Sequence, residues 1–477
     1  MPGRETPSGD IEGMDTINAG DTAWVLGSAG LVLLMTPGLA LFYGGMVRAK
    51  SVLNMMMMSF IALGTVTLAW VLWGYGESFG TSLDGLGLVG NPVGHIGLSD
   101  LLSADAVMGP PGHQIPTLAF AAFQATFAII AVALVSGAIA DRAKFSTWTV
   151  FTVLWATIVY FPVAHWVFDF STPTHAGGWI ASNLKAIDFA GGTVLEINCG
   201  AAGLALALVV GKRLGFRKDP MRPHNLTLVM LGAGLLWFGW FGFNAGSMLA
   251  ATGGTAIVWM NTLVAGAAGM MAWLGVERVR DGHATSFGAA SGLVAGLVAI
   301  TPSCSAVTPV GAIAIGGIAG ALCAYAVAWK FRYGYDDSLD VVGVHLVGGL
   351  VGTIGIGFFA SKAAPAGVDG LLAGGGVDQL WRQVVAAVAV LAFSFVLTGA
   401  LGLALHRTLG FRVDRDDEMR GVDLSEHLET AYDLVARGGR LGVGSAAQHL
   451  PDARHHDGHV PSSALDALTT PPQGDLA

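Results

Sequence analysis

The sequence predicts an all-α polytopic membrane protein. Of its 477 residues, 53% are hydrophobic and only 12% are charged, whereas an ordinary soluble domain carries about 25% charged residues. Apolar runs recur along most of the chain, and most are close to the ~20 residues that a helix needs to cross a bilayer. The 69 glycines suit helices that approach each other closely in lipid. We therefore expect a bundle of transmembrane helices.

Seven of the expected helices correspond to separate apolar runs that contain no Asp, Glu, Lys or Arg apart from Glu196 in the fifth. Two further runs, 224–276 and 282–329, contain no Asp, Glu, Lys or Arg and are each too long for one helix. They divide naturally at 244–254 and at 301–309, which gives four more helices and eleven in all. The seven separate runs are 23–47, 51–75, 115–140, 145–168, 189–211, 341–361 and 383–405. An odd number of crossings would place the two ends of the chain on opposite sides of the membrane.

Lysine and arginine are distributed unevenly between the loops. If the chain begins outside, the loops that face the cytoplasm hold thirteen of these residues, and the outward loops hold only Lys185, Lys362 and Arg382. Cytoplasmic loops of membrane proteins are enriched in Lys and Arg. We expect a multi-pass protein of the cell membrane with its N-terminus outside and its C-terminus in the cytoplasm. Residues 1–20 lack the pattern of a signal peptide, and either Met1 or Met14 could be the start.

These features divide the chain into four parts. We expect an external segment at 1–22, a membrane domain at 23–407, a cytoplasmic tail at 408–439 and a disordered extension at 440–477. The extension is rich in Ala, Pro, His, Ser and Asp without periodicity, which is typical of disorder.

One short helix is predicted inside the tail. Asp423-Leu-Ser-Glu426 has the pattern of a capping box that opens a helix. The apolar face of that helix would consist of Leu428, Ala431, Tyr432 and Val435, and Gly438-Gly439 would end it.

The fifth apolar run contains one ionisable side chain, Glu196. Asp188 lies just before this run, where a carboxylate would favour the start of a helix. Glu196 shares a helical stripe with Gly192, Gly200 and Gly203, so a second helix could approach it closely. A buried acid in a membrane helix is costly and marks an ion or proton path by default.

The tenth run repeats this design around His345. Asp340 precedes it, and Gly348, Gly349 and Gly352 lie on the same helical face. A lone buried histidine is more often a structural residue, but its pairing with Glu196 in the corresponding helix favours a functional role. This layout predicts two inverted five-helix repeats that meet at the two residues, followed by one long final helix.

Aromatic residues form a second group of candidate functional residues. Phe123 and Phe127 lie one helical turn apart, and the segment from Trp240 to Ser247 contains Phe243. Such rings could attract a small cation or close a pore as stacked gates, although aromatic belts at the membrane interface are also common. No redox, metal or nucleotide motif is present in the sequence. We therefore expect no enzyme activity, no cofactor, no metal and no nucleic-acid partner.

Several segments together resemble the ammonium transporter family (Amt/MEP/Rh). They are Asp188-Phe-Ala-Gly-Gly-Thr-Val, Phe42-Tyr-Gly-Gly-Met-Val-Arg, Trp240-Phe-Gly-Phe-Asn-Ala-Gly-Ser, Thr301-Pro, Asp336-Asp-Ser-Leu-Asp-Val-Val-Gly-Val-His345 and Gly421-Val-Asp-Leu-Ser-Glu-His. The resemblance covers roughly residues 20–436, in order. It implies a homotrimer in the lipid membrane with one pore per subunit, which takes up ammonium.

The resemblance also implies roles for individual residues. The outer substrate site would consist of Phe123, Phe168, Trp240 and Ser247, and the gate of Phe127 and Phe243. Glu196 and His345 would form the proton relay in the pore, and Asp188 would support the outer site through backbone contacts. The tail 408–439 would be regulatory and could bind a PII-type protein.

Three positions depart from the family pattern. Glu196 replaces the first of two pore histidines, as in some fungal members, and Phe168 takes the place of a usual Trp. The tail has His427-Leu-Glu where His-Gly-Glu is common.

In the implied mechanism, ammonium is split into ammonia and a proton, which cross the protein separately. Ammonium would lose a proton at the outer site, ammonia would pass the apolar pore, and the proton would travel through Glu196 and His345. Three alternatives stay open: a passive ammonia channel, an ammonium sensor with little transport, and a different secondary transporter. The tail leaves little room for a signalling domain, which disfavours the sensor.

Overall fold

The computed structural model describes residues 17–83, 85–219 and 221–432, and this part of the chain is mainly helical. Ten of its helical segments are long and apolar enough to cross a membrane. These are Ala19–Met46, Val52–Phe79, Thr117–Ile139, Phe145–Phe168, Gly192–Val210, Leu226–Gly246, Gly253–Arg280, Pro309–Tyr333, Val342–Phe359 and Asp378–Thr408. The predicted all-α polytopic class is confirmed. The eleventh expected crossing corresponds to a shorter apolar helix, Ser286–Ile300, so a count of eleven full crossings stays a prediction.

Four of the ten spans are single helices, and the other six are built from consecutive segments. The α-helices are α1 (Ala19–Met46), α2 (Val52–Ala69), α3 (Tyr75–Phe79), α4 (Thr117–Val135), α5 (Phe145–Trp155), α6 (Phe161–Phe168), α7 (Asn198–Val210), α8 (Leu226–Gly246), α9 (Gly253–Arg280), α10 (Ser286–Ile300), α11 (Pro309–Ala326), α12 (Trp329–Tyr333), α13 (Val347–Phe359), α14 (Asp378–Thr408), α15 (Arg415–Arg420) and α16 (Val422–His427). The π-helical segments are η1 (Trp70–Gly74), η4 (Ala156–Tyr160), η5 (Ile180–Leu184), η6 (Gly192–Ile197) and η7 (Val342–Leu346), and the 3₁₀ segments are η2 (Ile96–Leu102), η3 (Ser136–Ile139) and η8 (Leu371–Ala373). Two short antiparallel strands, β1 (Val107–Met108) and β2 (Ile115–Pro116), precede α4.

Side-chain caps fix where several of the long helices begin. Asn18 accepts a hydrogen bond from the third residue of α1, so this helix begins at Ala19, before the apolar run itself. Asn225 and Thr285 cap α8 and α10 in the same way. Thr308 caps α11, which also has a proline at its first position. Each cap satisfies an amide that has no partner within its own helix.

Glycines let the helices pack with almost no side chain between them. A Cβ atom on Gly352 of α13 would lie 2.0 Å from the carbonyl oxygen of Ala299 in α10, and one on Gly232 of α8 would lie 2.4 Å from the backbone nitrogen of Phe42 in α1. Neither position has room for even a methyl group. These contacts hold α13 against α10 and α8 against α1.

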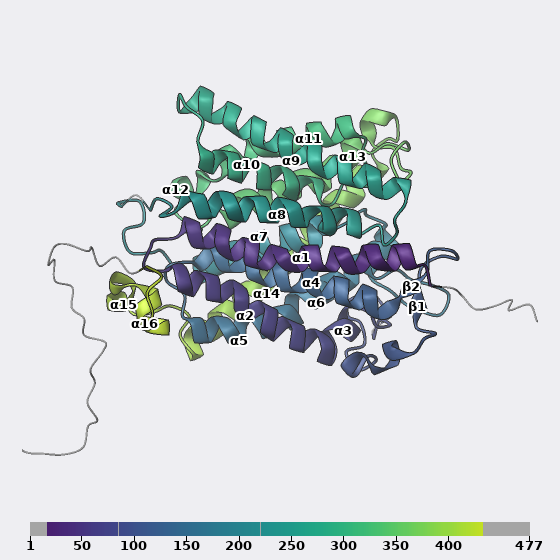
Figure 1. Cartoon of the computed structure of the whole chain (residues 1–477), viewed down its shortest axis with the longest axis horizontal. Helices are drawn as coiled ribbons and strands as arrows, with labels where there is room; N and C mark the ends of the chain where they lie inside the picture. The colour runs from purple at the N-terminus through teal and green to yellow at the C-terminus, as the bar shows by residue number, and fades with distance from the viewer. Residues whose placement is uncertain (1–16, 84, 220, 433–477) are drawn as a thin grey trace, which may run out of the picture. The chain divides into compact units, whose positions relative to one another are not determined.

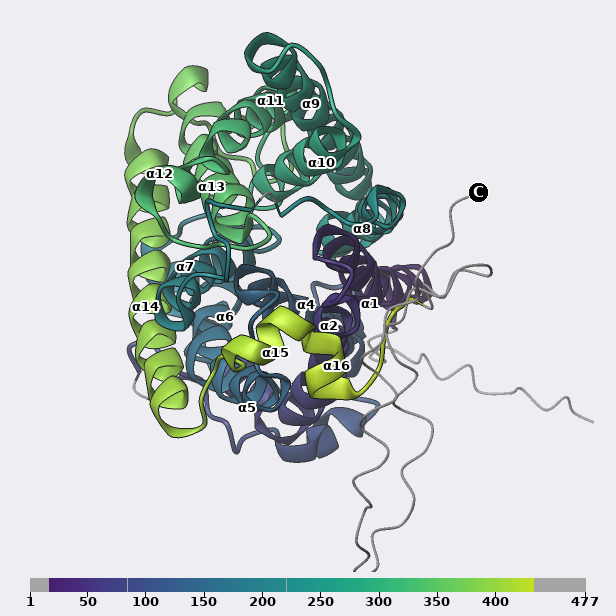
Figure 2. The ribbon, with the colours of Figure 1, turned by 90° about the vertical axis from the view of Figure 1, so that its left-hand side faces the viewer.

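The described part of the tail lies across one end of the helices. Figure 1 shows α15 and α16 at one end and β1 and β2 at the other. Figure 2 faces the first end and shows the two short helices crossing it. We call the end with α15 and α16 the tail side and the opposite end the far side.

The predicted capping box in the tail is wrong. Asp423 lies inside α16, and its carboxylate accepts the backbone N–H groups of Leu53 and Asn54 in α2, at 3.0 and 2.8 Å. Glu426 accepts the N–H of Phe145, the first residue of α5, at 2.8 Å. The first turns of α2 and α5 leave amides without partners, so the two acids cap membrane helices that are distant in sequence. Val435, Gly438, Gly439 and the extension 440–477 lie outside the described residues.

Candidate pore and its titratable pair

Glu196 and His345 meet inside the protein. Their side chains come from η6 and η7, and Nδ1 of His345 lies 2.7 Å from Oε2 of Glu196. The Glu196 side chain is 1% exposed and that of His345 is 6% exposed. The two ionisable side chains that the sequence places in separate apolar runs therefore form one buried pair.

Each member of the pair lies in a segment whose start is capped by an aspartate. Asp188 accepts the backbone N–H groups of Gly191, Gly192 and Thr193 at 2.8, 2.6 and 2.7 Å, and also the Thr193 hydroxyl. Asp337 accepts those of Val341 and Val342, at 3.1 and 2.7 Å. Both aspartates precede their pore residue by eight positions, a spacing that an internal repeat would produce.

Asp337, and not Asp340, is thus the counterpart of Asp188. The sequence pattern pointed to Asp340 because it directly precedes the apolar run. Its backbone instead takes a left-handed conformation, with φ 64°, just before the helix begins. Its carboxylate lies 2.7 Å from Nζ of Lys330.

The two predicted gate residues stack face to face. The ring centroids of Phe127 and Phe243 are 4.2 Å apart and their planes differ by 12°. Both side chains are buried, and Phe123 packs edge-on against Phe127 with centroids 4.8 Å apart. The two rings therefore fill the space between each other with no room for a further group.

Three of the four predicted outer-site residues adjoin this stack. Phe123 contacts it directly, and the ring of Trp240 lies 5.8 Å from that of Phe243 and donates its Nε1–H to Thr301 Oγ1 at 2.8 Å. The hydroxyl of Ser247 donates to the Phe243 carbonyl at 2.9 Å. Phe168 is the last residue of α6 and is partly buried, and within the described ranges no ring contact joins it to the other three.

A series of cavities leads from the gate to the tail side. The first, of about 20 Å³, is lined by Glu196 and His345 and otherwise by apolar and aromatic side chains, which include Phe243 of the stack. A second, of about 10 Å³, shares His345 and Phe42 with the first. About one water-sized molecule fits in the first of these. A third cavity of about 930 Å³ shares Met46, Leu339 and Asp340 with the second.

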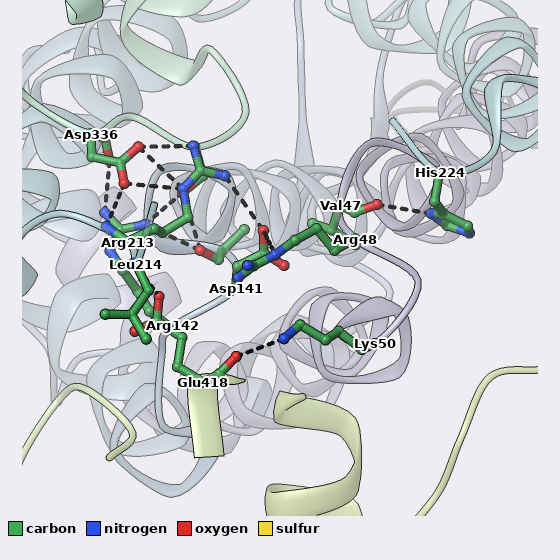
Figure 3. Close-up of polar contacts among 12 residues, drawn as sticks. Val47, Arg48, Lys50, Asp141, Arg142, Arg213, Leu214, His224, Asp336 and Glu418 are labelled. Carbon is green, nitrogen blue, oxygen red and sulfur yellow. Dashed lines mark hydrogen bonds and ion pairs between the residues drawn. The ribbon is translucent and has the colours of Figure 1, made fainter. Parts of the chain in front are cut away.

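The tail-side mouth is built around buried ion pairs that the sequence did not single out (Figure 3). Arg213 lies 2.8 Å from Asp336 and 3.4 Å from Asp141, and Arg48 also contacts Asp141, at 3.3 Å. Arg142 is fully buried and donates to the Asp336 carbonyl at 2.7 Å. Burial acts to raise the pKa of the Asp336 carboxyl, but Arg142 and Arg213 outweigh it and lower that pKa. Adjacent charges in a short loop, such as Asp141-Arg142, are the signal that could have indicated this cluster.

The tail joins the same cluster. Glu418 of α15 accepts the backbone N–H of Leu214 at 2.7 Å and pairs with Arg412 at 2.6 Å. Lys50 donates to the Glu418 carbonyl at 3.0 Å, as Figure 3 shows, and also to the carbonyl of Met419. The backbone N–H of Lys144 also donates to the carbonyl of Phe411 at 2.9 Å, so the tail is bonded to three of the segments that connect membrane helices.

Comparison with known proteins identifies the family. The model of the Ammonium Transporter Family matches residues 23–432. The chain belongs to this family. The match includes the described tail as well as the membrane helices.

Relatives with the name ammonium transporter cover nearly the whole chain. The Ammonium transporter of Mycobacterium tuberculosis is 55% identical over 446 residues, which are 90% of this chain and 93% of that protein. The Ammonium transporter of Corynebacterium glutamicum is 41% identical over 91% of this chain and 93% of that protein. The chain is therefore a member of a family of transporters and not of a family of enzymes.

Solved structures of the family share the fold. Mep2 of Saccharomyces cerevisiae superimposes with a TM-score of 0.75 at 32% identity, over 84% of this chain and 88% of that one. A structure titled Sensor Amt Protein gives a TM-score of 0.77 at 30% identity, over 86% of this chain and 98% of that one. These likenesses and the apolar helices together make this a multi-span membrane protein.

Proposed function

We propose that this protein takes up ammonium across the cell membrane and carries ammonia and the proton by separate routes. The observation that supports this most directly is the Glu196–His345 contact of 2.7 Å at the wall of an otherwise apolar cavity. Neutral ammonia can occupy such a cavity at little cost in free energy, whereas a proton needs the two titratable side chains. Deprotonation of ammonium yields both ammonia and a proton.

Capture takes place at the far side, next to the stacked rings. Phe123 and Trp240 offer aromatic faces, which attract small cations, and Ser247 and Phe168 complete the site. Asp188 holds the start of η6 through three backbone amides and touches no substrate. The ion loses its proton here, before the gate.

Selectivity follows from the need to deprotonate. Moving an ion from water into an apolar passage without compensation costs tens of kcal/mol. Ammonium avoids this cost because it can lose a proton and become neutral ammonia. Potassium has the same charge and no proton to lose, so the Phe127–Phe243 stack and the apolar cavity behind it exclude potassium.

The proton passes through the buried pair. At 2.7 Å one proton can be shared between Glu196 and His345. The second cavity connects His345 towards the tail side, where ammonia and the proton recombine.

The tail side is the cytoplasmic face in this proposal, because Lys and Arg gather there, and the N-terminus lies outside. The protein works as a homotrimer with one pore per subunit. The tail, which is bonded to Lys50 and Leu214, regulates transport and offers a surface for a PII-type protein.

Current and ammonia flux measured together in proteoliposomes test the proposal. An ammonium gradient should drive a current that rises with the number of transporters and is accompanied by ammonia flux. Flux without current would instead indicate a passive ammonia channel. Binding without either signal would indicate a sensor, a possibility of interest because one structural neighbour is titled Sensor Amt Protein. Either result would contradict the proposal.

A further inference from the structure

The third cavity is far larger than the passage of ammonia requires. Its volume is about 930 Å³, which lies in the range of sites that hold whole ligands. Five basic side chains line it, together with the acidic residues Asp219, Asp281 and Asp340. The basic residues are Arg213, Arg217, Lys218, Arg280 and Lys330.

Three of the five cations are neutralised within the protein. Arg213 pairs with Asp336 at 2.8 Å, and Arg280 pairs with Asp281 at 2.8 Å. Lys330 pairs with Asp340 at 2.7 Å. These side chains form the wall of the cavity and have little charge to offer a ligand.

Arg217 and its neighbours lack such partners. In the ranges that the structure describes, no carboxylate forms an ion pair with Lys212, Arg217 or Lys218. Nη2 of Arg217 donates to the carbonyl of Arg332 at 3.2 Å, which leaves most of its N–H groups free. All three cations are exposed.

Two of the unpaired cations are close neighbours. Gly334 ends α12 in a left-handed conformation, with φ 79°. From the position that a Cβ on this glycine would occupy, Nζ of Lys212 is 3.6 Å away and Nη1 of Arg217 is 3.7 Å away. Like charges this close repel each other, and an anion between them would remove the repulsion.

We propose that Arg217, which lines the cavity, and Lys212, which lies near it but outside the cavity lining, together bind a phosphate group. Arginine presents several N–H donors in a planar fork that matches phosphate oxygens, and a nearby lysine adds a second charge. The size of the cavity favours a ligand larger than a bare ion. The same cavity shares Met46, Leu339 and Asp340 with the one beside His345, so a ligand that fills it would reach the inner end of the proposed pore.

The phosphate belongs either to a lipid headgroup or to a soluble compound. The exposed aromatic side chains of α12 favour the headgroup: Trp329, Phe331 and Tyr333 are 45, 50 and 70% exposed. Aromatic residues of this kind gather at the level of the headgroups, and basic pockets between membrane helices can hold phospholipid headgroups. The proposal does not depend on ammonium passing through the pore.

Binding is measured on the purified full-length protein in detergent. The soluble probe is pyrophosphate, and the lipid probe is phosphatidylglycerol, with phosphatidylcholine for comparison. The test variant is Lys212→Gln with Arg217→Gln. The control is Arg278→Gln with Arg407→Gln, which removes two exposed cations of the tail side that do not line the cavity.

We expect wild-type protein to bind pyrophosphate or phosphatidylglycerol, and the test variant to bind the same probe at least about tenfold more weakly, because hydrogen bonds to two charged groups are lost. The control should change the affinity less than twofold. Binding of the lipid alone identifies a headgroup site, and competition by pyrophosphate identifies a site open to soluble ligands. Absence of binding by both probes, or an equal loss in both variants, would overturn the proposal.

Discussion

The carboxylate of Asp423 accepts the backbone N–H of Asn54 at 2.8 Å, so a residue of the tail completes the first turn of a membrane helix. The Leu53 amide binds the other oxygen at 3.0 Å. Burial raises the pKa of the Asp423 carboxyl, and the hydrogen bonds from α2 act in the opposite direction. Any movement of α2 at the tail side therefore changes how well the tail is held.

Replacing Asp423 with Asn should loosen the tail. The two N–H groups bind different oxygens of Asp423, and asparagine replaces one of these oxygens with an NH2 donor, so one hydrogen bond is lost. The loss of an N-cap costs about 1 kcal/mol. Limited proteolysis in detergent should cut the variant several-fold faster after α15. Asp416→Asn, which changes an exposed acid of α15, is the control. Equal cleavage of the two variants would show that the cap does not hold the tail.

Truncation separates the two parts of the tail. Removal of residues 412–477 deletes Glu418, Asp423 and Glu426 with all their contacts, and we expect it to lower ammonium transport. Removal of 440–477 alone should leave transport unchanged, because every described contact of the tail is kept. The measurement is uptake in proteoliposomes at equal protein content. Equal activity of the two truncations would end the regulatory role proposed for 408–439.

Leu428 occupies a position that suits glycine. It ends α16 with φ 56° and is 84% exposed, so its side chain gains little from packing. A left-handed conformation costs a residue with a Cβ roughly 1–2 kcal/mol, and glycine loses roughly 0.5–1 kcal/mol more in chain entropy on ordering. Leu428→Gly should therefore hold the tail about 0.5 kcal/mol more tightly. Leu428→Ala is the control, because it removes the leucine side chain but keeps the Cβ. It should show no gain in protection from protease, so a gain in Leu428→Gly alone would come from relief of backbone strain.

Glu196→Gln tests the relay. Gln keeps the shape and the hydrogen bond to His345 but cannot titrate, so the current should vanish while the protein folds and binds ammonium. Glu196→His restores a titratable group, and the current should return with a changed pH profile. An undiminished current in correctly folded Glu196→Gln protein would leave Glu196 as a structural acid or a simple attractor of cations.

The ion pair between Arg213 and Asp336 should make stability depend on pH. The pKa of Asp336 is lowered in the folded protein, so its stabilising contribution is present above the ordinary aspartate value of about 3.9 and is lost as the pH falls further. Thermal unfolding in detergent should show a drop below about pH 4. Asp336→Asn removes the closer of the two carboxylates that face the buried Arg213, which costs about 3 kcal/mol, and should flatten that part of the profile. An unchanged profile in the variant would assign the acid sensitivity to other groups.

The sequence alone was enough to predict site residues where an ionisable side chain lies in an otherwise apolar segment. Glu196 and His345 stand out because each is ionisable within an apolar run, and the structure brings the two together. Phe127 and Phe243 could be predicted as partners only through the family resemblance, since their stacking joins helices far apart in the chain.

Other contacts could not be predicted because their partners are backbone amides. Asp423 fits a local capping box by its spacing, yet the amides of α2 compete for its carboxylate, and nothing in the local sequence reveals their position. Sequence position alone favours Asp340 over Asp337 as the residue that caps the helix. Only the left-handed backbone of Asp340, with φ 64°, shows that Asp337 is the cap. Nothing in the sequence distinguishes Arg213 and Asp336 from solvated loop charges. Their burial as a pair is visible only in the structure.

The face-to-face contact of Phe127 and Phe243 also bears on kinetics. In the proposed mechanism, the passage closed by these two parallel rings opens only when at least one ring rotates, so each ammonia molecule has to wait for a side-chain motion. Under that condition throughput is set by the frequency of opening and not by the width of the hole, and it levels off as substrate increases. It also rises steeply with temperature, as expected of a carrier with a discrete cycle and not of a water-filled conduit.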